Sequence, residues 1–257
     1  MWRNIRITVL LLVLAVVAVS AWLDRHRTTS WRRTVWVGLY PLSADGSAIG
    51  SEYLKQLRET DFQPVEHFLT DESHRHGQSL NQPVRLLLFP TPAASPPALR
   101  AGEGRLGTLI WSLKLRWYRW RTLRASTQPA PQIALFLLYH DPSRQSVLPH
   151  SLGLQRGLTG VVHLYAEAAQ EAQNQIVIAH ELLHTFGATD KYDLQTLAPA
   201  WPEGFAEPQR QPRYPQSLAE IMAGRIPLDM AEQQMPDDLA QVLVGAATAR
   251  EIGWLRQ

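Results

Sequence analysis

The chain has 257 residues, of which 45% are hydrophobic and 19% charged, so it is long enough for one well-packed domain with or without an anchor. Its formal net charge of +2 neither indicates nor excludes an anionic partner. The absence of cysteine excludes a disulfide framework and any cysteine metal site, so a bound metal ion would need nitrogen and oxygen ligands.

The N-terminal segment is the first predicted element. Arg3 and Arg6 precede an uncharged run, Ile7 to Leu23, which is about as long as a bilayer is thick if it is helical. Residues 19–21 loosely fit a cleavage site, but the run is longer than a signal-peptide core. We therefore expect residues 1–25 to form an uncleaved single-pass transmembrane anchor. The simpler topology keeps a few residues inside and places the rest of the chain in the periplasm or outside the cell, although basic residues on both sides make the orientation signal weak.

Residues 34–257 are predicted to form one mixed α/β or α+β domain. Apolar runs bounded by turn residues predict four strands, at residues 34–42, 83–90, 132–140 and 157–166. Helical spacing predicts helices after Ser47 and at residues 105–124, 170–186 and 239–254, the last capped by Asp237 or Asp238. The remaining polar or proline-rich stretches are interpreted as loops, at residues 66–78, 90–97 and 197–216.

The segment Arg105 to Arg124 carries six basic residues and no acidic one, and its apolar residues recur at helical spacing, at Leu106, Ile110, Leu113, Trp117 and Trp120. An arginine-rich solvated face over a tryptophan-filled core contact explains this pattern. An anionic membrane surface beside the anchor is the alternative explanation. The segment has no recognisable nucleic-acid motif, so no nucleic-acid partner is expected.

The chemistry is concentrated in "HELLHTFGATD", residues 180–190. Histidines four apart on a helix lie about 40° apart around the axis and roughly 6 Å apart along it, so His180 and His184 can bind one cation. Glu181 is placed to accept a proton from water beside the metal instead of binding the metal. Gly187 can end the helix by adopting positive φ, which lets Asp190 return toward the metal as the third ligand.

This spacing resembles the zinc-binding consensus of the metzincin metallopeptidases, and its aspartate variant is similar to the snapalysin branch. The resemblance implies a metzincin-like catalytic domain and assigns Met222, in "AEIMAGR", to a methionine turn that supports the ligands without binding zinc. The predicted order of elements follows that clan over most of the chain. Three departures remain: four strands are evident instead of five, residues 105–124 look like an insertion, and no tyrosine stands two residues after Met222.

Other assignments stay open at this point. The third ligand could instead be Asp193, within a "GATDKY" similar to the aspzincin motif, or one of the downstream glutamates Glu203, Glu207 and Glu220. His163 lies on the strand before the active helix, which in the metzincins is the edge that pairs with substrate, although a solvated strand residue is the simpler interpretation. His67, His74 and His76 could bind a second metal, but a polar loop explains them. Tyr165 and Tyr192 could reach the site.

The sequence thus predicts a membrane-anchored zinc endopeptidase that hydrolyses peptide bonds, with Glu181 as the general base. The competing hypothesis is an anchored module that binds a peptide or an envelope partner and holds a structural zinc ion. Glu181 argues against the module, since a structural site has no use for a base there. The substrate, any activation step and the oligomeric state cannot be read from the sequence.

Overall fold

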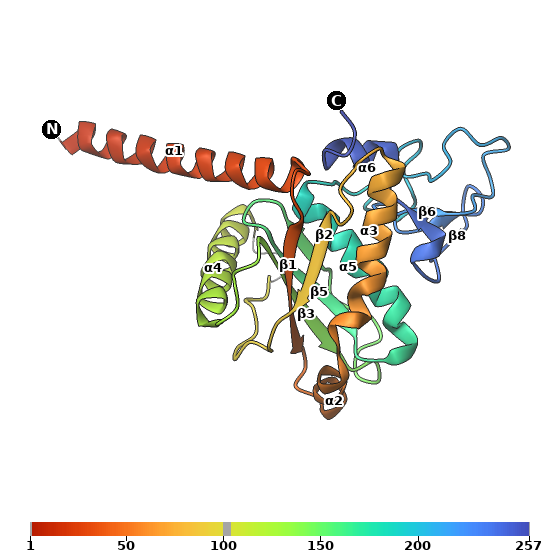
Figure 1. Cartoon of the computed structure of the whole chain (residues 1–257), viewed down its shortest axis with the longest axis horizontal. Coiled ribbons are helices and arrows are strands. Elements are labelled where there is room, and N and C mark those ends of the chain that lie inside the picture. The colour runs from red at the N-terminus through yellow and green to blue at the C-terminus, as the bar shows by residue number, and fades with distance from the viewer. Residues whose placement is uncertain (1, 100–103, 257) are drawn as a thin grey trace.

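The computed structural model describes residues 2–99 and 104–256, which form an α+β fold around a mixed β-sheet (Figure 1). The sheet has five strands in the order β2-β1-β3-β5-β4. Strands β1 (Val35–Ser43), β2 (Val84–Leu88), β3 (Ile133–His140) and β5 (Thr159–Tyr165) run parallel. Strand β4 (Leu152–Leu154) pairs antiparallel with β5 at one edge. The four strands expected from the sequence are thereby confirmed.

Helices cover both faces of this sheet because successive side chains of a strand point to opposite faces. Val37 and Leu39 of β1 pack in one core cluster with α3 (Gln63–Arg75) and α5 (Glu171–Phe186). Tyr40 and Leu42 pack on the other face with α4 (Gly104–Ala125). The helix α5, which carries the histidine motif, therefore lies on the face opposite to α4.

Shorter elements complete the chain. Helix α2 (Ala48–Gln56) begins as expected at Ser47, whose side chain accepts a hydrogen bond from the Gly50 N–H. Three 3-10 turns lie at Glu59–Phe62 (η1), Ala168–Gln170 (η2) and Leu239–Gln241 (η3). Two small sheets pair β6 (Ala219–Glu220) with β9 (Val242–Leu243), and β7 (Ile226–Pro227) with β8 (Gln233–Gln234). The C-terminal helix is α6 (Ala246–Glu251).

The expected transmembrane anchor is wrong. Residues Trp2–Thr29 do form a helix, α1, which extends away from the sheet (Figure 1), but no helix within the described ranges is long and apolar enough to cross a membrane. The uncharged run from Ile7 to Leu23 lies at the short end of the roughly 17 to 25 residues that a spanning helix needs, and charged residues adjoin both of its ends. The membrane localisation inferred from this run is withdrawn with it.

Two further expectations about secondary structure are corrected. The polar segment around His67 is not a loop but helix α3, which buries Val65, Phe68 and Leu69 against the sheet. On its outer side His67, Asp71 and His74 are exposed. The long helix expected over residues 239–254 is divided into η3, β9 and α6. Gly245 is the extended N-cap residue of α6, so the helix begins only after it.

Helix α4 forms where the basic segment predicts it, but it packs with a different face. Its buried side chains are Trp111, Leu115 and Tyr118. The apolar residues expected in the core are exposed instead: Leu106, Ile110, Leu113, Trp117 and Trp120. Apolar residues occur on both sides of this helix, so periodicity alone could not select the side that meets the sheet.

Candidate metal centre

The histidine motif lies on the second half of α5, whose other face is anchored in the core by Ile178, Leu182 and Leu183. The helix ends at Gly187, which adopts φ 108° in the left-handed region. The N–H of Gly187 donates to His184 O, and the next N–H donates to Leu183 O, so the helix closes with a glycine C-cap. The chain then reverses and returns to the histidines, as the spacing of Gly187 and Asp190 after His184 predicts.

This reversal brings three ligand atoms together. His180 Nε2 lies 3.1 Å from His184 Nε2. Asp190 Oδ1 lies 3.3 Å from His180 Nε2 and 3.2 Å from His184 Nε2. The three atoms form a nearly equilateral triangle, and the three side chains are 16%, 16% and 33% exposed for His180, His184 and Asp190, so the group is reachable from solvent on one side.

Two backbone carbonyls determine which ring nitrogens face the centre of this triangle. His180 Nδ1 lies 2.9 Å from Ile221 O, and His184 Nδ1 lies 2.8 Å from Ala188 O. A carbonyl oxygen only accepts hydrogen bonds, so each Nδ1 carries a proton and each neutral ring presents the lone pair of Nε2 inward. Two lone pairs and a carboxylate oxygen therefore face one another, which is stable only if protons or a metal cation lie among them.

The pKa values of His180 and Asp190 are shifted because these groups lie so close together. Burial alone would lower the pKa of His180, but the hydrogen bond to Asp190, the charge of Glu181 and the Ile221 carbonyl outweigh it and raise the pKa. Burial opposes ionisation of Asp190, yet hydrogen bonds from both histidines hold its pKa well below the ordinary value. In the metal-free protein the carboxylate is thus ionised and stabilises positive charge on the His180 imidazole.

Glu181 is a second carboxylate beside the histidines. Its side chain is buried, and one ligand atom from each of His180, Glu181 and His184 falls within 4.8 Å of the other two, a spacing that could hold a metal ion. Its Oε2 has no hydrogen-bond partner in the described chain. Burial raises the pKa of Glu181, while the two histidines and a hydrogen bond from the Gly153 backbone oppose the rise. A buried, unpaired carboxylate oxygen is costly, which points to a proton or ligand that it is placed to meet.

The edge strand β4 approaches α5 closely at Gly153. A Cβ at this position would lie 2.2 Å from Glu181 O and 2.7 Å from His184 Cβ, so only glycine allows the contact. Strand β4 was not predicted because its three residues, Leu-Gly-Leu, are too few to show an alternating pattern. The glycine between two leucines was the available signal, since a glycine within a strand often marks a close backbone approach.

The turn after β6 supports the site from the core side. Met222 is fully buried in the same cluster as Leu182 and Leu183, and the carbonyl before it accepts the His180 Nδ1 hydrogen bond. The carbonyl of Met222 itself accepts from the Lys191 N–H at 2.9 Å, directly after Asp190. The turn thus contacts both ends of the ligand set through backbone atoms.

Lys191 connects the Asp190 loop to the C-terminal helix. Its side chain is 4% exposed, and its Nζ lies 2.7 Å from Glu251 Oε1 of α6. Glu251 also accepts from the N–H and the hydroxyl of Thr189. The residues on both sides of Asp190 are therefore fixed to α6, which sets where the Asp190 carboxylate lies.

Glu220 is not available as a ligand because its four hydrogen bonds are used inside the fold. Its Oε2 accepts from the N–H groups of Met222 (2.6 Å) and Ala223 (3.0 Å). Its Oε1 accepts from the Gly245 N–H (3.1 Å) and the Thr248 hydroxyl (2.6 Å). This buried carboxylate joins the methionine-containing turn to α6.

The other alternative ligands also lie outside the triangle. Asp193 accepts hydrogen bonds from the backbone of Gln195 and Thr196. Glu207 pairs with Arg210, and Glu203 is exposed. Of the four alternatives, none takes the place of Asp190 beside the two imidazoles.

The remaining histidines and tyrosines have separate surroundings. His74 and His76 contact different backbone carbonyls, of Leu80 and Val244, and the described residues contain no second cluster that includes them or His67. His163 lies on β5, an inner strand, so the alternative that placed it at the substrate-pairing edge is wrong. It is a partly buried strand residue whose Nδ1 lies 2.8 Å from His140 Nε2. The edge strand is β4.

The two tyrosines differ. The Tyr165 hydroxyl donates its hydrogen bond to Ser146 O, away from the histidines. Burial, the charge of Asp190 and a hydrogen bond with Asp190 raise the pKa of Tyr192, so the Tyr192 hydroxyl is a neighbour of the Asp190 carboxylate.

No protein-family model matches the chain, and no curated protein matches it in sequence.

We expect the full chain to bind one divalent metal ion, for which zinc serves as the probe, with an affinity that falls as the pH decreases. Binding needs the Nε2 lone pairs, and the raised pKa of His180 means that protons already compete above the ordinary value of 6.5. Competition titrations with a chromogenic chelator between pH 6 and 8 measure the zinc affinity at each pH. A zinc affinity that does not change over that range would contradict the assignment.

Glu220→Gln should destabilise the protein and weaken zinc binding. The amide nitrogen cannot accept, so it leaves two N–H or O–H donors unpaired in the core, at about 1–3 kcal/mol each. The displaced turn carries the His180 acceptor, so zinc affinity should fall roughly 10- to 100-fold. Urea unfolding and zinc titration measure the two effects. Glu207→Gln, on a carboxylate that is 40% exposed, is the control and should change neither by more than a small amount.

Proposed function

We propose that the chain is a zinc-dependent peptidase whose zinc ion is held by His180, His184 and Asp190. The observation that carries the proposal is the triangle of electron-rich atoms with edges of 3.1 to 3.3 Å beside the unpaired carboxylate of Glu181. Tetrahedral zinc with bonds of about 2.0 to 2.1 Å needs ligand atoms roughly 3.3 Å apart. The edges fit that requirement.

The type of ligand favours zinc over the hard cations. Calcium and magnesium take six or more oxygen ligands, whereas two imidazoles with one carboxylate are typical of zinc and of other borderline metals. Three protein ligands are also typical of a catalytic zinc site, because a structural site usually has four. Both points support a site that leaves one position open.

When it is bound, zinc lowers the pKa of water at the open position to about 7 and polarises a carbonyl group. The residues of the chain would provide the remaining steps. The two histidines and Asp190 hold the centre, and the carbonyls of Ile221 and Ala188 keep the two rings in the correct tautomer. Glu181 accepts the proton of the attacking water on its unpaired Oε2 and then passes it to the leaving amine. The raised pKa of Glu181 suits this exchange, since a general base works best with a pKa near the working pH.

A peptide substrate is supported by the edge strand β4. No described strand pairs with its outer edge, and β4 touches α5 at Glu181 through Gly153. An extended peptide can add to such an edge through main-chain hydrogen bonds, which would place its carbonyl groups next to the base. The five-stranded sheet also supplies the strand that the resemblance to the metzincins required, so the resemblance stands as part of this proposal.

Glu181→Gln should keep zinc and lose cleavage. The amide preserves the shape of the side chain but cannot take a proton, so hydrolysis of a peptide library should fall about 10²- to 10⁴-fold. Zinc content by mass spectrometry and cleavage by peptide profiling measure the two quantities. Glu171→Gln, at the start of the same helix, is the matched control and should retain full activity. A wild-type protein that binds zinc but cleaves no peptide in the library would overturn the proposed function.

Asp190→Asn and Asp193→Asn separate the two possible aspartate ligands. The Asp190 variant should lose zinc affinity by more than the roughly 10- to 100-fold typical of an outer-shell change. The Asp193 variant should bind zinc normally, because the Asp193 carboxylate accepts hydrogen bonds from the 195–196 backbone and lies outside the triangle. Zinc competition titration and thermal unfolding decide between them. If the Asp193 variant instead loses zinc affinity and the Asp190 variant keeps it, Asp193 is the third ligand.

A further inference from the structure

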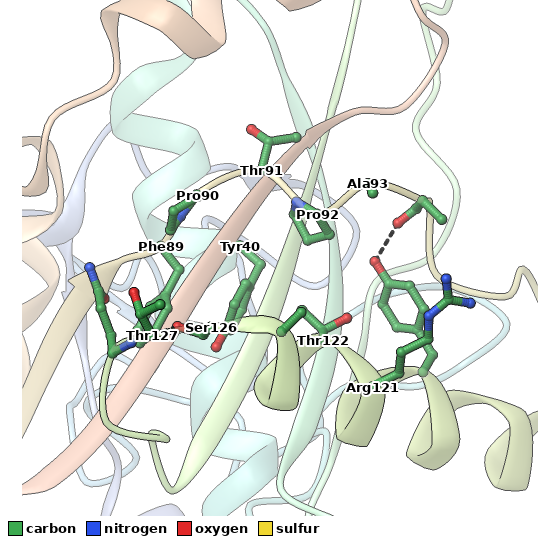
Figure 2. A pocket seen from close by; sticks show the side chains of 14 residues that line it. Tyr40, Phe89, Pro90, Thr91, Pro92, Ala93, Arg121, Thr122, Ser126 and Thr127 are labelled. Atoms are coloured by element: carbon green, nitrogen blue, oxygen red, sulfur yellow. Dashed lines mark hydrogen bonds between the residues drawn. The ribbon is translucent and has the colours of Figure 1, made fainter.

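A cavity of about 340 Å³ lies on the face of the sheet opposite to α5, between β1, helix α4 and the segment Phe89–Ala94 (Figure 2). This volume is at the small end of ligand pockets, which range from roughly 300 to 1,000 Å³. It equals the liquid volume of about 11 water molecules, which suits a ligand of roughly 10 to 15 non-hydrogen atoms. Neither the zinc proposal nor the resemblance gives this cavity a role.

The floor of the cavity is formed by aromatic rings that one glycine makes possible. Tyr40 and Phe89 stack with their ring centroids 4.8 Å apart at 29°. A Cβ on Gly38 would lie 2.9 Å from the Tyr40 ring, 3.1 Å from the Phe89 ring and 2.7 Å from Pro131. Glycine at this position leaves room for the two stacked rings.

The proline-rich wall of the cavity is tied to α4 at two points. The Tyr118 hydroxyl donates to Ala94 O at 2.5 Å, shown as the dashed line in Figure 2. The indole N–H of Trp111 donates to Pro97 O at 2.8 Å. The segment expected to be a plain linker is therefore held over the cavity by two hydrogen bonds from buried aromatic side chains.

The Tyr40 hydroxyl lacks a partner. Tyr40 is 2% exposed and lines the cavity, yet its hydroxyl forms no hydrogen bond with any described residue. Burial raises the pKa of Tyr40 to about 12, partly offset by Arg119, so the group stays protonated at neutral pH and can donate. An unpaired buried hydroxyl is unfavourable, and Tyr118 nearby shows that the fold can satisfy such a group.

The lining of the cavity includes polar groups and a positive charge. Arg121 is exposed and lies beside Thr122 at the mouth, whereas Ser126 and Thr127 lie on the other side of the cavity (Figure 2). No acidic residue is among the described residues that line the cavity. An anionic group at the mouth would therefore meet the Arg121 guanidinium.

We propose that this cavity binds a small aromatic molecule that carries a hydrogen-bonding group at its buried end and a carboxylate at its exposed end. The aromatic body lies against Tyr40 and Phe89, where stacking adds to the burial of apolar surface. The buried polar group accepts from the Tyr40 hydroxyl, and the carboxylate pairs with Arg121 at the mouth. The small volume excludes a folded partner.

The probe for this proposal is 6-hydroxynaphthalene-2-carboxylate, with 14 non-hydrogen atoms, titrated into the full chain and followed by its fluorescence. Tyr40→Phe removes only the hydroxyl, so the probe should bind about 10-fold more weakly or worse. Naphthalene-2-carboxylate, which lacks the buried hydroxyl, should bind both proteins equally. EDTA should change none of these affinities, which keeps this test separate from the zinc proposal.

Thermal unfolding without ligand provides a second measurement. Tyr40→Phe should leave Tm unchanged or raise it, because the lost hydroxyl has no partner in the fold. Tyr118→Phe is the matched control and should lower Tm by about 2–4 °C, because it loses a formed hydrogen bond. A Tyr40→Phe protein that loses as much Tm as the control would show that the hydroxyl is structural and would overturn the proposal.

The charge at the mouth is tested with a pair of arginine variants. Arg121→Gln should weaken binding of 6-hydroxynaphthalene-2-carboxylate about 2- to 5-fold, as expected for an exposed ion pair, and should not affect 2-naphthol. Arg124→Gln, whose guanidinium lies over the Trp120 ring outside the cavity, should change neither. No saturable binding of the carboxylate probe by wild type, or equal binding by wild type and Tyr40→Phe, would also overturn the proposal.

Discussion

Two backbone carbonyls, Ile221 O and Ala188 O, determine what the candidate metal centre can do. By accepting hydrogen bonds from Nδ1 of His180 and His184, they leave the lone pair of each Nε2 directed at the same point. The carbonyls come from different parts of the chain, one from the turn before Met222 and the other from the reversal after Gly187. The centre therefore depends on tertiary structure at both rings. Glu220 and Lys191 hold these two segments against α6 and so act on the ligands indirectly.

The two proposed binding sites lie on opposite faces of the sheet. Its α5 face carries the histidines, the buried Glu181 and the edge strand that touches them at Gly153. Its α4 face carries a cavity with aromatic walls and the unpaired Tyr40 hydroxyl. Because β1 places alternate residues in the two cores, Leu39 and Tyr40 serve opposite faces while being neighbours in sequence. The two proposals thus share one strand and can be tested independently.

The sequence predicted those parts of the fold that local pattern specifies. Long apolar strands, the Gly187 cap and the i, i+4 histidines follow from spacing within a few residues, and the structure places them as expected. Three features depended on contacts distant in sequence. Strand β4 is too short to have a pattern, α4 has apolar residues on two sides, and one partner of Glu220, Thr248, lies on α6, 28 residues away. The anchor was inferred from an apolar run alone, and run length near the lower limit does not decide such a case.

The connection of Lys191 to Glu251 has a consequence for the order in which the protein is made. The histidines leave the ribosome about sixty residues before α6, which fixes the Asp190 loop through Lys191 and Thr189. At roughly 5 to 20 residues per second this interval lasts about 3 to 12 seconds. During that time a captured metal ion would be held by two imidazoles and solvent. A metal ion at this centre would therefore be retained tightly only once α6 has docked against the Asp190 loop.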